Sequence, residues 1–106
     1  MGRIVTFVEV ENPSDIEKRI ECDALIDNAA SHMVLQIGWR ARLGELRELG
    51  IVDMERADHS LLRGTVCGPV QIQIEGFRPI FSKIVFVDMK PEDGKYEPLV
   101  GYIVLE

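Results

Sequence analysis

Apolar and polar residues alternate along much of this chain, a pattern typical of β-strands that bury one face. The clearest case is VQIQIEG, in which Val70, Ile72 and Ile74 fall on one side and polar residues on the other. Runs rich in β-branched residues predict further strands at 3–11, 20–26, 33–35 and 80–88.

The period changes once, to that of a helix. Trp39, Leu43, Leu46 and Gly50 fall at helical spacing with Arg and Glu between them, so we predict one helix with Gly50 as its C-cap and the three larger residues as its packed face. From Val52 onward the pattern returns to β.

Turn-forming and polar segments separate the predicted strands. NPSD at 12–15 ends the first strand, ADHS at 57–60 forms the turn between two arms of a hairpin, and MKPEDGKYEP at 89–98 is a polar loop. Many short strands with one helix predict a mainly β domain, a small closed barrel or a sandwich.

The length of 106 residues is typical of one domain, which we expect to span 1–106. A chain this small has little room to surround a deep cleft, so a deep cleft would have to be built between two copies. The formal charge of −6, without a dense Lys/Arg cluster, argues against nucleic-acid binding. No apolar run is long enough to cross a bilayer and no signal peptide is recognisable, so we predict a cytoplasmic protein that binds no membrane.

The chain offers few metal ligands in a recognisable arrangement. Cys22 and Cys67 each stand alone in an apolar stretch, which favours reduced, buried thiols over a disulfide or a metal pair. His32 and His59 have no second ligand at a typical spacing. We therefore predict no metal site.

One carboxylate stands out. In ALIDNAASHMVL, Asp27 directly follows an apolar run, and a carboxylate is rarely buried without a partner. Taken alone, Asp27 is a turn residue or a helix N-cap beside Asn28, or it has a functional role.

The stretch resembles the active-site segment of retropepsin-like aspartic proteases, which have an apolar strand, then Asp-Thr-Gly or Asp-Ser-Gly, then Ala, Ser and more apolar residues. The resemblance extends along most of the chain. ADHS stands where the family has its flap, GPVQIQIEG where it has the strands beyond the flap, and LVGYIVLE where it has an apolar-apolar-Gly motif before a helix.

This resemblance implies a closed retropepsin-like barrel with one helix, acting as a homodimer in which each subunit supplies Asp27 as the catalytic carboxylate. It implies an endopeptidase that hydrolyses peptide or protein substrates and needs no cofactor. The flap would comprise Ala57, Asp58, His59 and Ser60, and the residues supporting the Asp loop would be Leu99, Val100 and Gly101. Taken alone, His59 is a solvated turn residue and Gly101 a close-packing position.

The active-site loop departs from the family pattern at two positions. Ala30 and Ser31 match it, but Asn28 replaces the Thr or Ser whose hydroxyl supports the loop, and Ala29 replaces a Gly. An added methyl at the Gly position could strain the loop or intrude on the substrate site. The chain is therefore either a working variant, or a dimer that kept the fold without the chemistry and acts as a peptide-binding or assembly module.

Overall fold

The computed structural model describes residues 4–27, 32–55, 61–88 and 98–101. Within these residues the chain forms β-strands and one short helix, so the prediction of a mainly β fold is confirmed. The elements are β1 (Val5–Asn12), β2 (Asp15–Asp27), β3 (Met33–Gln36), the 3₁₀-helix η1 (Ile37–Leu43), β4 (Arg47–Glu55), β5 (Leu61–Ile74), β6 (Ile80–Val87) and β7 (Leu99–Gly101).

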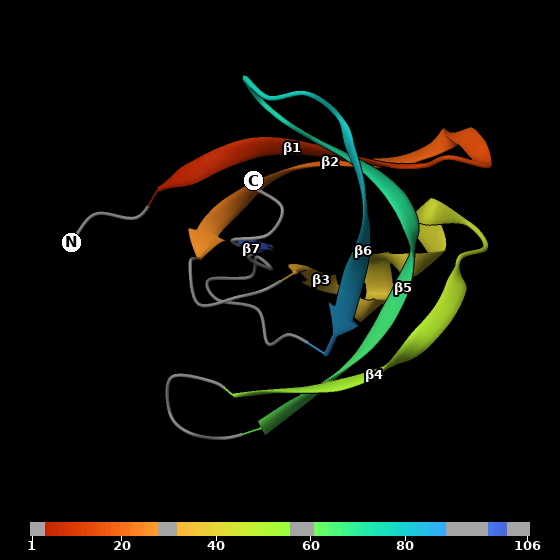
Figure 1. Ribbon diagram of the computed structural model, residues 1–106, viewed down its shortest axis with the longest axis vertical. Helices are drawn as coiled ribbons and strands as arrows, with labels where there is room; N and C mark the ends of the chain where they lie inside the picture. Colours follow the sequence, from red (N-terminus) through yellow and green to blue (C-terminus); the bar gives the residue numbers. More distant parts are fainter. Residues whose placement is uncertain (1–3, 28–31, 56–60, 89–97, 102–106) are drawn as a thin grey trace.

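The strands belong to one sheet in the order β1-β2-β7-β3-β6-β5-β4, and an additional pairing between β1 and β5 closes it into a ring. The second half of the long strand β5 makes this closing contact, from Val8 opposite Ile74 to Glu11 opposite Gln71. Figure 1 shows the β1–β2 pair at the top and the β4–β5 hairpin at the bottom, with β7 and β3 between them. Strand β4 flanks the ring, paired with the first half of β5.

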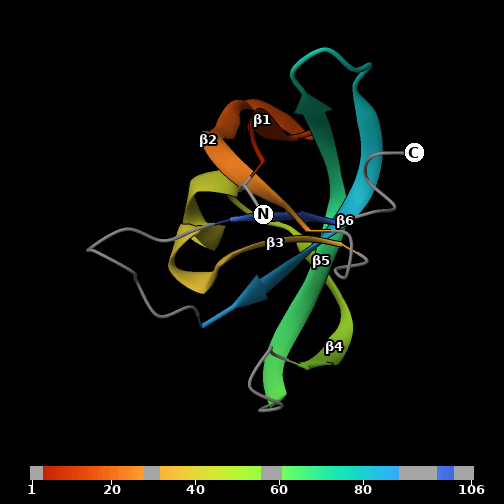
Figure 2. The ribbon, with the colours of Figure 1, turned by 90° about the vertical axis from the view of Figure 1, so that its left-hand side faces the viewer.

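The structure has a hairpin at each of two breaks in the sequence pattern, although only the second was predicted as a hairpin. The break at 12–15 separates β1 from β2, although β2 begins at Asp15 rather than near Ile20. Strands β4 and β5 pair as the arms of the second hairpin, and the predicted turn at 57–60 lies outside the described residues. Seen from the side, this hairpin extends away from the rest of the sheet (Figure 2).

The predicted extent of the helix was wrong. Helix η1 ends at Leu43, where Gly44 has φ +71° and donates its N–H to the Ala41 carbonyl at 3.2 Å. This left-handed conformation favours glycine, so Gly44 takes the capping role that the sequence pattern assigned to Gly50. Gly50 lies inside β4, where the pairing with β5 shifts register. No helix in the described ranges is long and apolar enough to span a membrane.

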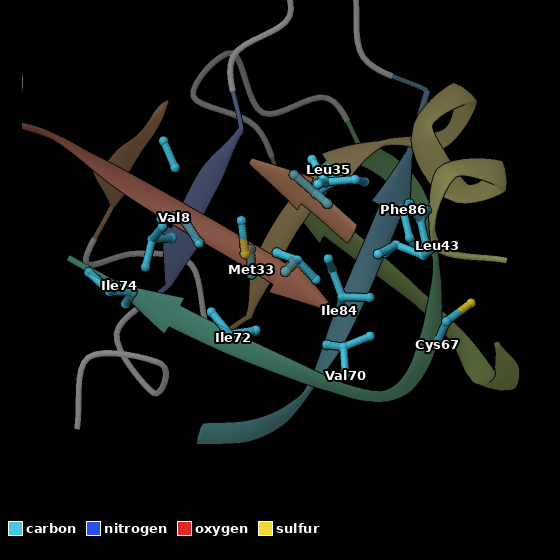
Figure 3. Packing of buried hydrophobic residues seen from close by; sticks show 14 residues of the cluster. Val8, Met33, Leu35, Leu43, Cys67, Val70, Ile72, Ile74, Ile84 and Phe86 are labelled. Atoms are coloured by element: carbon cyan, nitrogen blue, oxygen red, sulfur yellow. The ribbon is translucent and has the colours of Figure 1, made fainter. Parts of the chain in front are cut away.

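The main core lies inside the ring. Figure 3 shows its side chains pointing toward one another from strands on different sides of the fold. The predicted alternation on β5 is confirmed, since Val70, Ile72 and Ile74 are all buried. The buried members of this main core are Val8, Val10, Ile20, Ala24, Met33, Leu35, Leu43, Cys67, Val70, Ile72, Ile74, Ile84, Phe86 and Val100. Trp39 and Leu46 pack against it, so the residues predicted as a packed helix face do face the core.

A second apolar cluster lies on the opposite face of the central strands. Every residue of β3 and of the second half of β6 (84–87) is buried, and since successive side chains point to opposite sides of a strand, these segments are buried on both faces. The buried members of this cluster are Val34, Val66, Val85 and Val87, and Val52, Leu62 and Leu99 pack against them. The second apolar cluster therefore joins the β4–β5 hairpin to β3, β6 and β7.

Candidate active site

Asp27 is the last residue of β2, and its backbone position is fixed by pairing with β7. The two strands run parallel, with Leu25 opposite Leu99 and Asp27 opposite Gly101. The Leu25 N–H donates to the Pro98 carbonyl at 2.8 Å. A strand from the end of the chain thus lies directly beside the residue that the sequence pattern singled out.

Strand β7 also contacts the strand that follows the predicted active-site loop. It pairs antiparallel with β3 at Val34 opposite Leu99, so it lies between β2 and β3 in the sheet. The loop residues Asn28, Ala29, Ala30 and Ser31 and the flap residues Ala57, Asp58, His59 and Ser60 lie outside the described residues. The strands on both sides of positions 28–31 are nevertheless tied to the same short strand.

The three predicted loop-supporting residues occupy different environments on β7. Val100 is fully buried in the main core, Leu99 is partly buried against the second apolar cluster, and Gly101 is buried beside Asp27. Because Leu99 precedes Gly101 by two residues, the second apolar cluster begins close to Asp27.

The sequence analysis missed the second apolar cluster as part of this region. Strands β4 and β5 contribute Val52, Leu62 and Val66 to it, on the face that lies opposite the main core. Val85 and Val87 of the neighbouring strand β6 belong to the same cluster. The available signal was the run IVFV at 84–87, which is apolar at every position and therefore typical of a strand buried on both faces.

Both cysteines are free thiols, as predicted, and Cys67 is buried while Cys22 is partly buried. Burial, reinforced by the neighbouring Asp23 carboxylate, raises the pKa of Cys22 from 9.0 to about 11. Burial also raises the pKa of Cys67. Within the described residues, no group of three His, Cys, Asp or Glu side chains is placed to hold a metal ion.

Comparison with known proteins adds a structural relative. No family model and no curated protein matches the chain. Among solved structures, the EIAV protease complexed with the inhibitor HBY-793 matches with a TM-score of 0.65 and 20% sequence identity, over 94% of this chain and 82% of that chain. With its mainly β architecture and single short helix, the chain has a retropepsin-like fold.

Proposed function

We propose that this protein is an aspartic endopeptidase that acts as a homodimer, with one Asp27 from each subunit forming the catalytic pair. The observation that carries the proposal is the position of Asp27 at the end of β2, in register with Gly101 of β7, within a fold similar to that of the EIAV protease. A single chain of 106 residues brings one such position, so a second copy supplies the other carboxylate.

The proposed chemistry follows from two carboxylates in close proximity. Two such groups cannot both ionise cheaply, so the pair shares one proton. The ionised carboxylate removes a proton from a water molecule, which attacks the peptide carbonyl carbon, while the protonated carboxyl donates to the carbonyl oxygen. The carboxyl that took the water proton then donates it to the amide nitrogen while the other carboxylate accepts a proton from the diol, and the C–N bond breaks to release an amine and a carboxylic acid. The reaction requires no metal or cofactor.

In this proposal an extended peptide binds on the side of the sheet that carries the β4–β5 hairpin. The β4–β5 hairpin and the second apolar cluster lie on the side of the sheet where β7 presents Leu99. In this proposal the hairpin turn, Ala57 to Ser60, is the flap that covers the peptide and adds main-chain hydrogen bonds to it.

The second candidate function is a dimeric peptide-binding or assembly module without catalysis. It is favoured by Asn28 and Ala29, which stand where active members of the family have a hydroxyl residue and a glycine. An amide is longer than a hydroxyl and differently shaped, and the added methyl of Ala29 restricts the backbone. Under this alternative the same side of the sheet binds an extended peptide and releases it intact.

Cleavage of a diverse peptide library between about pH 4 and 7 distinguishes the two. The wild type is compared with Asp27→Asn, and pepstatin serves as an inhibitor control. The endopeptidase proposal predicts cleavage by the wild type that Asp27→Asn abolishes. If neither protein cleaves, Asn28→Thr combined with Ala29→Gly is the decisive variant: activity gained there identifies a protease disarmed by two substitutions, and continued silence refutes the endopeptidase.

A further inference from the structure

Asn12 is a buried polar residue with an unusual set of partners. Its side chain is 4% exposed, and its amide Nδ2 donates to the Leu43 carbonyl at 2.7 Å and to the Glu45 carbonyl at 3.1 Å. Its Oδ1 accepts the Ser14 N–H at 2.9 Å. Each polar atom of this amide therefore has a partner, and both donor contacts reach residues more than thirty positions away.

These contacts secure the end of η1 and the segment that leads into β4. The last carbonyl groups of a helix have no partner within the helix, and Asn12 supplies one to Leu43. The positive φ of Gly44 turns the chain toward β4. The hydrogen bond to the Glu45 carbonyl then fixes the backbone just beyond this turn. The pairing of β1 with β2 shifts register between Glu11 and Asn12, and such irregularities redirect a side chain.

A second contact secures the start of β4 itself. The Arg40 guanidinium of η1 donates to the Glu48 carboxylate at 2.8 Å, and this hydrogen bond raises the pKa of Arg40 further above its usual value. Helix η1 thus contacts β4 through Arg40 and is itself held at its C-terminal end by Asn12. Further along β4, Val52 packs on the second apolar cluster.

We propose that Asn12 is a positioning residue for the peptide-binding side of the protein, because its amide fixes where β4 begins and so how the β4–β5 hairpin sits over the second apolar cluster. The substrate-facing part of this inference rests on the proposed function. Asn12 touches no reacting group and acts through the backbone of 43–45.

Two substitutions test this role. Asn12→Asp keeps the shape and the acceptor for Ser14 but replaces the donor with an oxygen that faces two carbonyl groups, and Asn12→Ser shortens the side chain so that it no longer reaches them. The control is Val8→Ala, which leaves a cavity in the main core and lies on the same strand as Asn12. Each variant is measured at the denaturant concentration at which all the proteins have the same free energy of unfolding.

Amide hydrogen exchange is the first readout, with peptides covering β4 and β6 compared in each variant. Loss of the buried hydrogen bond to Leu43 and the partly buried one to Glu45 predicts exchange in β4 that is roughly tenfold faster or more relative to β6 in both Asn12 variants, and no relative change in Val8→Ala. An unchanged ratio in the Asn12 variants, or the same rise in Val8→Ala, overturns the proposal.

Peptide cleavage is the second readout. A misplaced hairpin weakens substrate binding, so both Asn12 variants are expected to raise KM several-fold and to change kcat by less than about twofold. Equal KM in wild type and variants overturns the substrate-facing part. A wild type that cleaves nothing counts against the proposed function, not against the role of Asn12, and the exchange ratio then decides whether Asn12 positions the hairpin.

Discussion

Gly64 of β5 lies opposite Val87 of β6, and Gly64→Ala probes the contact between the hairpin and the second apolar cluster. A Cβ added at Gly64 would meet Val85 Cγ1 closely and would lie 2.9 Å from Val87 Cγ1 and 3.4 Å from the Phe86 carbonyl oxygen. Val85 and Val87 are 1% and 0% exposed, so neither has free space into which it can move. A glycine here allows the two strands and both valines to pack.

The expected cost follows from overpacking a filled core. Forcing an extra methyl into such a site costs about 1–3 kcal/mol, which outweighs the gain of up to about 1 kcal/mol from restricting the unfolded chain. For a domain of this size each kcal/mol corresponds to roughly 4–8 °C in Tm. We therefore expect Gly64→Ala to lower Tm by about 5–15 °C.

Gly38→Ala is the matched control, because a Cβ there would lie 3.8 Å from the nearest atom, in the Gln36 side chain, which is an ordinary contact. Urea unfolding followed by the fluorescence of Trp39, the one tryptophan in the sequence, measures both variants. We expect Gly38→Ala to be as stable as the wild type or slightly more so.

A double variant tests the cause. Val85→Ala removes the methyl group that the new Cβ meets most closely but leaves the Val87 contact, so Gly64→Ala is expected to cost clearly less stability in the Val85→Ala background than in the wild type. Additive losses, or a Gly64→Ala variant within about 0.5 kcal/mol of the wild type, would refute the packing argument.

Three further outcomes follow from the structure. Burial raises the pKa of Cys22 from 9.0 to about 11, so the thiolate fraction at pH 8 is about a hundredfold lower in the folded protein than in the unfolded chain. Alkylation of Cys22 should therefore be at least a hundredfold faster in urea, and equal rates in the folded and unfolded protein would contradict the burial. The same shift predicts that stability falls as pH rises from about 9 to 11, since the Cys22 thiol ionises there only in the unfolded chain. Cys22→Ser should reduce this slope in chemical denaturation curves, and Cys67, whose pKa burial also raises, accounts for a part that remains. The Arg63–Asp53 pair at 3.3 Å is exposed on both sides, so Asp53→Asn should change the free energy of unfolding by at most about 0.5 kcal/mol, and a loss above 1 kcal/mol would show that the pair matters.

Local patterns in the sequence predicted most of the strands, because a strand with one buried face shows its burial in every second residue. VQIQIEG is the clearest example, and its alternation matches the burial of Val70, Ile72 and Ile74. The helix was predicted too long because Leu46 and Gly50 fell at helical spacing by coincidence. The segment from Arg47 onward forms strand β4 because it pairs with β5. Such pairing between distant segments overrides the helical spacing of apolar residues in the local sequence.

Contacts between distant segments were beyond what local patterns could predict. Asn12 was correctly placed at a strand end, but its bonds to Leu43 and Glu45 depend on how η1 lies against β1 and β2. The closure of the ring by β1 and β5 is likewise a long-range pairing. For the candidate site, the motif at Asp27 and the later LVG were recognised separately, and the structure adds that they lie in register on adjacent strands.

The most direct test of the central claim is subunit mixing between the wild type and Asp27→Asn. If catalysis needs one Asp27 from each subunit, a mixed dimer is inactive, and four equivalents of the variant randomly assorted with a fixed amount of wild type should reduce activity to about one fifth. Activity that stays constant as the variant is added, with mixed dimers demonstrated by mass spectrometry, would contradict a shared pair of Asp27 carboxylates.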